Sequence, residues 1–155
     1  MKTQSKVLVV EDDDDLRRGL MLRLRTYGYD VVAAQDGVAA VSIARQEQPD
    51  LVLLDLGLPG GDGFTVLERY ANLPALCAIP VVVLTGRDPR TSEPAARKFH
   101  VAAFLRKPVD NDVLARTITL ALRGETVPAA AVPDDPSAGP FVPDWSAWPP
   151  PPLRP

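Results

Sequence analysis

The chain has 155 residues, of which 46% are apolar and 24% charged, and its net charge of −3 gives no indication of a surface for nucleic acid or an anionic membrane. No apolar run approaches the roughly 18 residues of a membrane span, so we expect a cytoplasmic protein without membrane insertion. The single cysteine, Cys77, is expected to be a small buried residue and excludes an intramolecular disulfide framework.

Short apolar runs alternate along the chain with segments of helical periodicity. Three of these runs are continuously apolar, as in strands that are buried on both faces of a parallel sheet. We predict strands at residues 6–10, 30–34, 51–55, 80–84 and 102–105.

Between the strands, apolar residues recur three and four positions apart, which places them on one face of a helix. The apolar stripes are Leu16, Leu20, Leu24 and Tyr27, then Ala40, Val41 and Ala44, then Val66, Leu67 and Tyr70, and last Val113, Leu114, Thr117, Ile118, Ala121 and Leu122. Asp110 is expected to cap the last helix and Gly124 to end it. The alternation predicts an α/β fold with helices on both faces of the sheet.

The fourth helical segment, "DPRTSEPAARKFH", has the weakest pattern. We expect about two turns there, with Ser92 as the N-cap. Pro94 would be tolerated only in the first turn, because proline lacks the backbone N–H that later turns require.

The composition changes abruptly after the last helix, since ten of the 17 prolines follow it. Such a density of proline is incompatible with a helix or a sheet. We therefore predict a folded domain over residues 1–124 and a proline-rich C-terminal tail over residues 125–155. The tail is either a flexible spacer or a docking segment, for which the possible anchors are Phe141, Trp145 and Trp148.

Polar side chains stand where the predicted strands end. Glu11 and Asp12 follow the first strand, and Asp55 closes the third. Thr85 follows the fourth strand and Lys107 the fifth. Because ligands of open parallel sheets bind outside the carboxyl ends of the strands, we expect these side chains to converge there.

These residue types favour phosphoryl transfer. Carboxylate oxygens suit Mg²⁺, which would relieve the repulsion among Glu11, Asp12 and Asp55. The Thr85 hydroxyl and the Lys107 ammonium are donors for an anion such as a phosphoryl group. Asp55 is the expected nucleophile, because it ends the central strand of the run.

Residues 11–15 are five consecutive carboxylates, and only the first two are expected to need a metal ion. Asp13, Asp14 and Asp15 are instead expected to form the cap and the solvated first turn of a helix. The helix dipole stabilises negative charge at that end.

Four segments, "VLVVEDDDDLRRGL", "PDLVLLDLGLPGGDGF", "VVVLTGRD" and "FLRKP", resemble the motifs of receiver domains from bacterial two-component response regulators, in the order found in that family. The resemblance covers roughly residues 5–123 and implies a stand-alone receiver similar to the chemotaxis-type regulators. It implies a flavodoxin-like, doubly wound sheet of five parallel strands in the order 2-1-3-4-5, with five helices.

The resemblance also implies a role for each residue at the strand ends. Asp55 would accept a phosphoryl group from a histidine kinase or a histidine phosphotransfer protein. Lys107, whose bond to Pro108 is typically cis in this family, would contact the phosphoryl oxygens. The Mg²⁺ ligands would be Glu11, Asp12, Asp55 and the backbone carbonyl of Gly57.

A conformational switch is implied as well. Thr85 would move toward the phosphoryl group, and Phe104 would turn inward behind it. These two movements would remodel the face formed by the fourth helix, the fifth strand and the fifth helix. A downstream protein would bind to that face. The alternative for Phe104 is an ordinary, partly buried aromatic residue. Gly57 and Arg87 occupy the positions that tune dephosphorylation in this family.

We therefore expect a phosphorylation-activated response regulator that signals through protein–protein contacts. Its chemistry would be limited to self-catalysed phosphoryl transfer to Asp55 and slow self-dephosphorylation. The alternatives are a phosphorylation-independent adaptor with the receiver fold and a phosphate sink for a shared kinase. A metal-dependent phosphatase is a third possibility, but the sequence offers no second catalytic acid for it.

Overall fold

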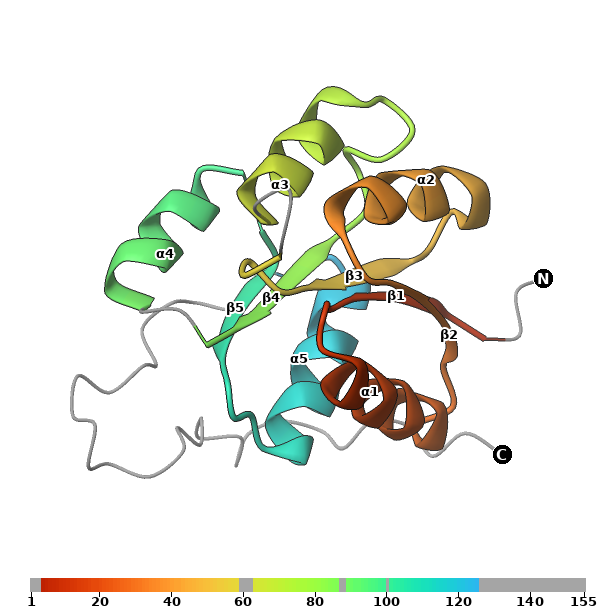
Figure 1. Ribbon diagram of the computed structural model, residues 1–155. Helices are drawn as coiled ribbons and strands as arrows, with labels where there is room; N and C mark the ends of the chain where they lie inside the picture. Colours follow the sequence, from red (N-terminus) through yellow and green to blue (C-terminus); the bar gives the residue numbers. More distant parts are fainter. Residues whose placement is uncertain (1–3, 59–62, 87–88, 100, 126–155) are drawn as a thin grey trace.

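In the described part of the chain, five parallel strands form one sheet with helices on both faces (Figure 1). The computed structural model describes residues 4–58, 63–86, 89–99 and 101–125. The strand order is β2-β1-β3-β4-β5, so the predicted fold class and strand order are confirmed. The strands are β1 (Lys6–Val10), β2 (Asp30–Ala34), β3 (Leu51–Leu54), β4 (Val81–Thr85) and β5 (Ala103–Arg106).

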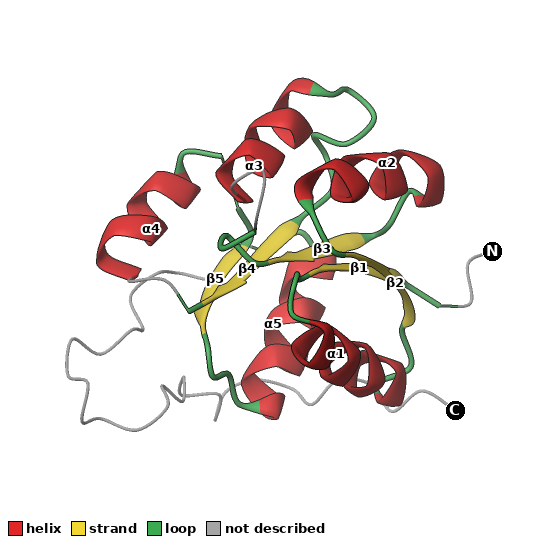
Figure 2. Cartoon of the chain, in the orientation of Figure 1, coloured by secondary structure: helices red, strands yellow, loops and turns green. Residues whose placement is uncertain are grey.

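The helices of the described residues alternate with these strands. They are α1 (Asp14–Thr26), α2 (Gly37–Glu47), α3 (Gly63–Asn72), α4 (Pro89–Arg97) and α5 (Asn111–Leu122). Helices α1 and α5 cover one face of the sheet, and α2, α3 and α4 cover the other (Figure 2). Right-handed crossovers between parallel strands produce this doubly wound arrangement.

The core consists of two hydrophobic clusters, which the sheet separates. On β1, Val7 and Val9 pack in the cluster beneath α1 and α5, whereas Leu8 and Val10 pack in the cluster beneath α2, α3 and α4. Side chains alternate between the two faces of a strand, and both faces of β1 are covered. The continuously apolar sequence of this strand is therefore explained by burial on both sides.

The predicted apolar stripes are confirmed at most positions, including Leu20 and Leu24 of α1 and the whole stripe of α3. The prediction for Leu16 is wrong, because its side chain is 49% exposed. Leu16 lies in the first turn of α1, and its side chain stays outside the core cluster that Leu20 and Leu24 of the same helix join. Val41 and Leu122 are only partly buried.

The predicted helix ends are confirmed where the sequence offered an aspartate or a glycine. The Asp13 carboxylate accepts a hydrogen bond from the Leu16 backbone N–H at 3.0 Å and caps α1. The Asp110 carboxylate accepts one from the Asp112 N–H at 2.8 Å and caps α5. Gly124 follows α5 with φ of 79°, a left-handed conformation that glycine adopts without strain.

Helix α4 differs from the prediction at its start. It begins at Pro89, so Ser92 is a buried residue inside the helix and the prediction of Ser92 as its cap is wrong. Pro89 suits the first helical position, because its missing N–H would have no partner there. Pro94 consequently falls in the helix interior rather than in the first turn.

Three further sequence expectations concern the burial of Cys77, membrane insertion and the tail. Cys77 is exposed, so its predicted burial is wrong; the preceding residue, Leu76, takes the fully buried position instead. None of the described helices has the length and apolar character needed to cross a bilayer. The predicted tail anchors, Phe141, Trp145 and Trp148, lie outside the described residues.

Replacing Pro94 by alanine is expected to stabilise the fold. Alanine supplies the N–H that proline lacks and removes the contact between the proline ring and the carbonyl four residues earlier. Because alanine also adds freedom to the unfolded chain, we expect a net gain of about 1 to 2 kcal/mol, measured by urea unfolding. Pro89→Ala, at the first helical position, is the control and should give no gain. Equal effects of both substitutions would contradict this account.

Candidate functional site

The carboxyl ends of β1, β3, β4 and β5 bring the predicted polar residues to one edge of the sheet. The Glu11 N–H donates to the Ala34 carbonyl at 3.1 Å, and the Asp55 N–H donates to the Val10 carbonyl at 3.0 Å. The Lys107 N–H donates to a carbonyl of β4 at 2.9 Å. The strand pairing thus continues into the site residues and fixes their backbone.

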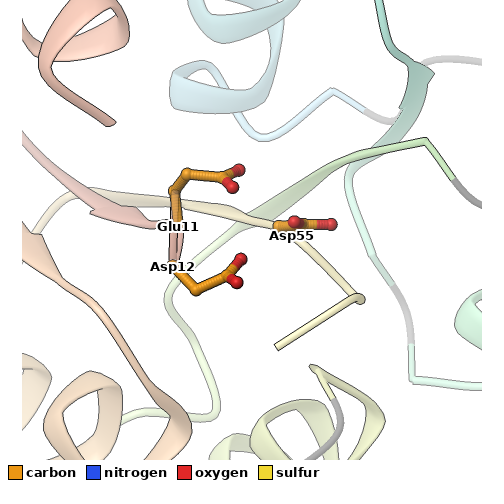
Figure 3. A group of neighbouring side chains, drawn as sticks. All are labelled: Glu11, Asp12 and Asp55. Carbon is orange, nitrogen blue, oxygen red and sulfur yellow. The ribbon is translucent and has the colours of Figure 1, made fainter. Parts of the chain in front are cut away.

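Three carboxylates converge at this edge. One oxygen from each of Glu11, Asp12 and Asp55 lies within 4.8 Å of the others, and Figure 3 shows the side chains arriving from the ends of two adjacent strands. Glu11 is 2% exposed and Asp55 8%, whereas Asp12 is exposed. Negative charges held this close and largely buried repel one another strongly unless a cation lies among them.

Lys107 supplies one positive charge to this group. Its Nζ lies 2.5 Å from Glu11 Oε2 and 3.3 Å from Asp55 Oδ2. Burial alone would lower the pKa of Lys107, but the hydrogen bond from its ammonium to Glu11 and the charges of Asp55 and Glu11 outweigh burial and raise it. Lys107 is therefore held as a cation between the two buried carboxylates.

Folding raises the pKa of the Glu11 carboxyl group. Burial raises its pKa, as does the nearby charge of Asp55, although the hydrogen bond from Lys107 acts in the opposite direction. A carboxyl group whose pKa is raised by folding favours the fold below its unfolded-state pKa. That contribution is lost as the pH rises through the folded-state pKa. Folding therefore disfavours the ionised form of Glu11, and a cation bound beside it would favour that form.

Asp55 is oriented by contacts on both of its oxygens. The Gly57 backbone N–H donates to Asp55 Oδ1 at 3.0 Å, while Oδ2 faces Lys107. A Cβ atom at Gly57 would lie 3.6 Å from Oδ1 and 3.7 Å from Oδ2, in ordinary contact with the carboxylate. A side chain at this position would cover Asp55, and glycine leaves that approach open.

Gly63, the first residue of α3, packs directly against the backbone that carries Asp55. A Cβ atom at this position would lie 2.5 Å from the Leu56 Cα and 2.7 Å from the Asp55 carbonyl oxygen. The Gly63 N–H also donates to the Leu56 carbonyl at 3.1 Å. Only glycine permits this approach, which presses the start of α3 against the end of β3.

The remaining predicted residues are placed as follows. Thr85 is the last residue of β4 and is fully buried, and Phe104 on β5 is 7% exposed and packs in the cluster beneath α2, α3 and α4. The peptide bond between Lys107 and Pro108 is cis, as expected. Arg87 lies outside the described residues.

Sequence patterns did not single out Arg17, whose guanidinium donates to the backbone carbonyls of Glu11 and Asp12. It also pairs with Asp14, three residues earlier on α1. Opposite charges three residues apart on a helix indicate an ion pair, so this contact could be predicted from the sequence. Nothing in the sequence indicates the contacts of Arg17 with the loop between β1 and α1.

The three carboxylates fit a Mg²⁺ ion. Mg²⁺ prefers oxygen ligands, binds through a few carboxylates and retains several waters, and Asp12 provides the solvent-exposed side that those waters require. The three carboxylates and one ammonium leave a local charge of −2, which a divalent cation balances.

Residues 7–119 match the family model described as "Response regulator receiver domain". The chain belongs to this family. PilH of Pseudomonas aeruginosa is 33% identical over 120 residues, which are 77% of this chain and 99% of PilH. The response regulator PleD of Caulobacter vibrioides is 36% identical over 110 residues, which are 71% of this receiver chain but 24% of PleD.

Solved structures agree with the receiver fold. A response regulator receiver protein from Pseudomonas putida has a TM-score of 0.72 at 25% identity and covers 77% of this chain and 98% of its own. The receiver domain of a sensor histidine kinase from Pseudomonas aeruginosa, described with a magnesium ion coordinated in the active site cleft, has a TM-score of 0.72 at 24% identity. That likeness covers 78% of this chain and 99% of the other.

Gly63→Ala is expected to destabilise the fold, because its Cβ would lie too close to backbone atoms that cannot move independently. We expect a loss of about 1 to 3 kcal/mol in the free energy of unfolding. Gly19→Ala is the matched control, because Gly19 lies inside α1 and a Cβ there meets nothing within 4 Å. This control should gain about 0.5 to 1 kcal/mol from helix propensity. The free energy of unfolding is measured with urea for both variants. A change of the same sign in both would refute the close-packing argument.

Proposed function

We propose that this receiver domain accepts a phosphoryl group on Asp55 in a Mg²⁺-dependent reaction and signals through contacts with other proteins. The observation that supports the proposal is the convergence of Glu11, Asp12 and Asp55 within 4.8 Å, with Lys107 contacting two of them. The phosphoryl donor would be the phosphohistidine of a histidine kinase or of a histidine phosphotransfer protein, because receiver domains act with such kinases.

The Mg²⁺ ion would be held by Glu11, Asp12 and Asp55, with the backbone carbonyl of Gly57 as a further ligand. When bound, it would neutralise negative charge on the carboxylates and on the incoming phosphoryl oxygens. The same fold holds magnesium in the kinase receiver domain from Pseudomonas aeruginosa. For this chain, the support is the spacing and the chemistry of its own carboxylates.

Asp55 is the nucleophile in this proposal. One of its carboxylate oxygens forms a bond to phosphorus while the phosphorus–nitrogen bond of the donor breaks, and the electron pair returns to the imidazole. The Gly57 N–H, 3.0 Å from Oδ1, fixes the orientation of the carboxylate during this step. Lys107 and Thr85 would donate hydrogen bonds to the phosphoryl oxygens, as their positions at neighbouring strand ends allow.

The downstream protein would bind to the face formed by α4, β5 and α5. Phe104 connects this face to the core, since it is 7% exposed and pairs in register with Val83 on β4, two residues before Thr85. A shift of Thr85 toward the phosphoryl group would bias Phe104 between two packing states and so change the outer surface. In the alternative of a phosphorylation-independent adaptor, the wild type and the Asp55→Ala variant would bind the partner protein with equal affinity. In the alternative of a phosphate sink, there would be no such partner protein.

Incubation of the full chain with a small-molecule phosphodonor and Mg²⁺ tests the proposal. We expect a mass gain of one phosphoryl group that requires Mg²⁺ and disappears in Asp55→Asn. Asp15→Asn, which removes an exposed carboxylate from the first turn of α1, is the control and should be phosphorylated like the wild type. A mass gain that persists in Asp55→Asn would refute Asp55 as the acceptor.

The lack of a side chain at Gly57 is expected to affect the lifetime of the phosphoryl group on Asp55. Larger side chains at this position would lie over Asp55 and hinder the attacking water. We expect Gly57→Met to slow spontaneous dephosphorylation on the order of tenfold, which corresponds to about 1.4 kcal/mol of barrier, and Gly57→Ala to have a smaller effect. Loss of label after removal of the donor measures this rate. Faster loss in Gly57→Met, or a change in the distant control Gly19→Ala, would contradict the steric explanation.

A further inference from the structure

We propose that Arg17 is a positioning residue that holds the backbone of Glu11 and Asp12 so that both carboxylates face the metal site. The proposal rests on the proposed function, because it concerns the Mg²⁺ ion that these carboxylates would bind. Among the described residues, Arg17 contacts the backbone carbonyls of Glu11 and Asp12 and the carboxylate of Asp14, not the carboxylates of the site. It acts through the loop between β1 and α1.

The contacts of Arg17 are directed at main-chain atoms of this loop. Its Nη1 donates to the Glu11 carbonyl oxygen at 3.0 Å and to the Asp12 carbonyl oxygen at 3.4 Å. Its Nη2 pairs with Asp14, and the side chain is only 14% exposed. A planar guanidinium can bridge several acceptors in fixed directions, so this one arginine ties two loop carbonyls to the first turn of α1.

Asp12 depends on this backbone support more than the other two carboxylates do. Glu11 is held by Lys107 and by the Asp13 N–H, which donates to Glu11 Oε1 at 3.3 Å. Asp55 is held by Gly57 and Lys107. The Asp12 carboxylate is exposed and, among the described residues, accepts no hydrogen bond. Its position is therefore set by its own backbone.

The cap of α1 fixes only the far end of the loop. The Asp13 carboxylate accepts from the Leu16 N–H at 3.0 Å, and the Asp13 carbonyl accepts from the Arg17 N–H at 2.9 Å. The Glu11 N–H, bonded to β2, fixes the near end. Arg17 holds the two carbonyls that lie between these ends, and those belong to the two ligand residues.

A positioning role and a purely electrostatic role of Arg17 predict opposite changes in Mg²⁺ affinity when Arg17 is neutralised. A positive charge near the site repels Mg²⁺, so a purely electrostatic role means that neutralising Arg17 would tighten metal binding. A positioning role means that neutralising it would weaken metal binding, because the ligands would no longer be oriented. Lysine separates the two effects, since it keeps the charge but loses the planar fork.

The test compares Arg17→Lys and Arg17→Gln with Arg18→Gln in the full chain, using Mg²⁺ titrations followed by calorimetry. Arg18 is the matched control, because it is the exposed neighbour on the same helix and its loss removes the same charge. We expect the Kd for Mg²⁺ to rise about tenfold in both Arg17 variants and to stay at the wild-type value in Arg18→Gln. At saturating Mg²⁺, the phosphorylation rate of Arg17→Lys should recover to that of the wild type.

A second readout does not depend on metal. Hydrogen exchange of the Asp13 amide, measured without Mg²⁺, should be faster in both Arg17 variants, because the loop that aligns it with Glu11 is released. Unchanged exchange, or a wild-type Kd in Arg17→Lys with a lower Kd in Arg17→Gln, would overturn the positioning role and leave only a charge effect. Failure of the proposed function has a different signature, in which wild type binds no Mg²⁺ although the Arg17 variants still show faster exchange.

Discussion

The repulsion among Glu11, Asp12 and Asp55 is the constraint on which the site depends. Two like charges about 4 Å apart repel by about 1 kcal/mol in water and by roughly four times as much in a partly buried protein site. Lys107 offsets part of this repulsion, but one ammonium cannot balance three carboxylates. The pKa of Glu11 is raised first by burial and then by the charge of Asp55. A divalent cation bound among these carboxylates would supply the missing positive charge.

The scaffold resists the movement by which these carboxylates would separate. Glu11 and Asp55 are bonded through their backbones to the neighbouring strands, and Gly63 presses α3 against the backbone of Asp55. Burial on both faces of β1 and β3 keeps those strands in register, so the charges cannot spread without breaking the core. The repulsion lowers stability at this edge of the sheet, but the fixed backbone preorganises the three carboxylates as a group of ligands. Such a loss of stability is common at functional sites.

Strong local signals were sufficient to predict the five strands to within one residue at each end, as well as the Asp13 and Asp110 caps. Strands buried on both faces are continuously apolar, and parallel strands share one carboxyl edge, so Glu11 and Asp55 were identifiable without coordinates. The errors occur where tertiary geometry decides the outcome. Leu16 has the right helical phase but its side chain stays outside the core cluster, and Ser92 resembles a cap although Pro89 already begins the helix. Arg17 was missed because its acceptors are backbone carbonyls, which no side-chain pattern displays.

Lys107 cannot neutralise Glu11 and bind a phosphoryl group with equal strength at the same time. Its ammonium is closer to Glu11 than to Asp55, at 2.5 Å against 3.3 Å. A cation bound to Glu11 would weaken that attraction and leave Lys107 to Asp55 and whatever Asp55 carries. Without the cation, a dianionic phosphoryl group would enter a site whose local charge is already −2, from three carboxylates and one ammonium. In the proposed reaction, electrostatics would therefore favour metal binding before phosphoryl transfer, and Lys107 would couple the two events.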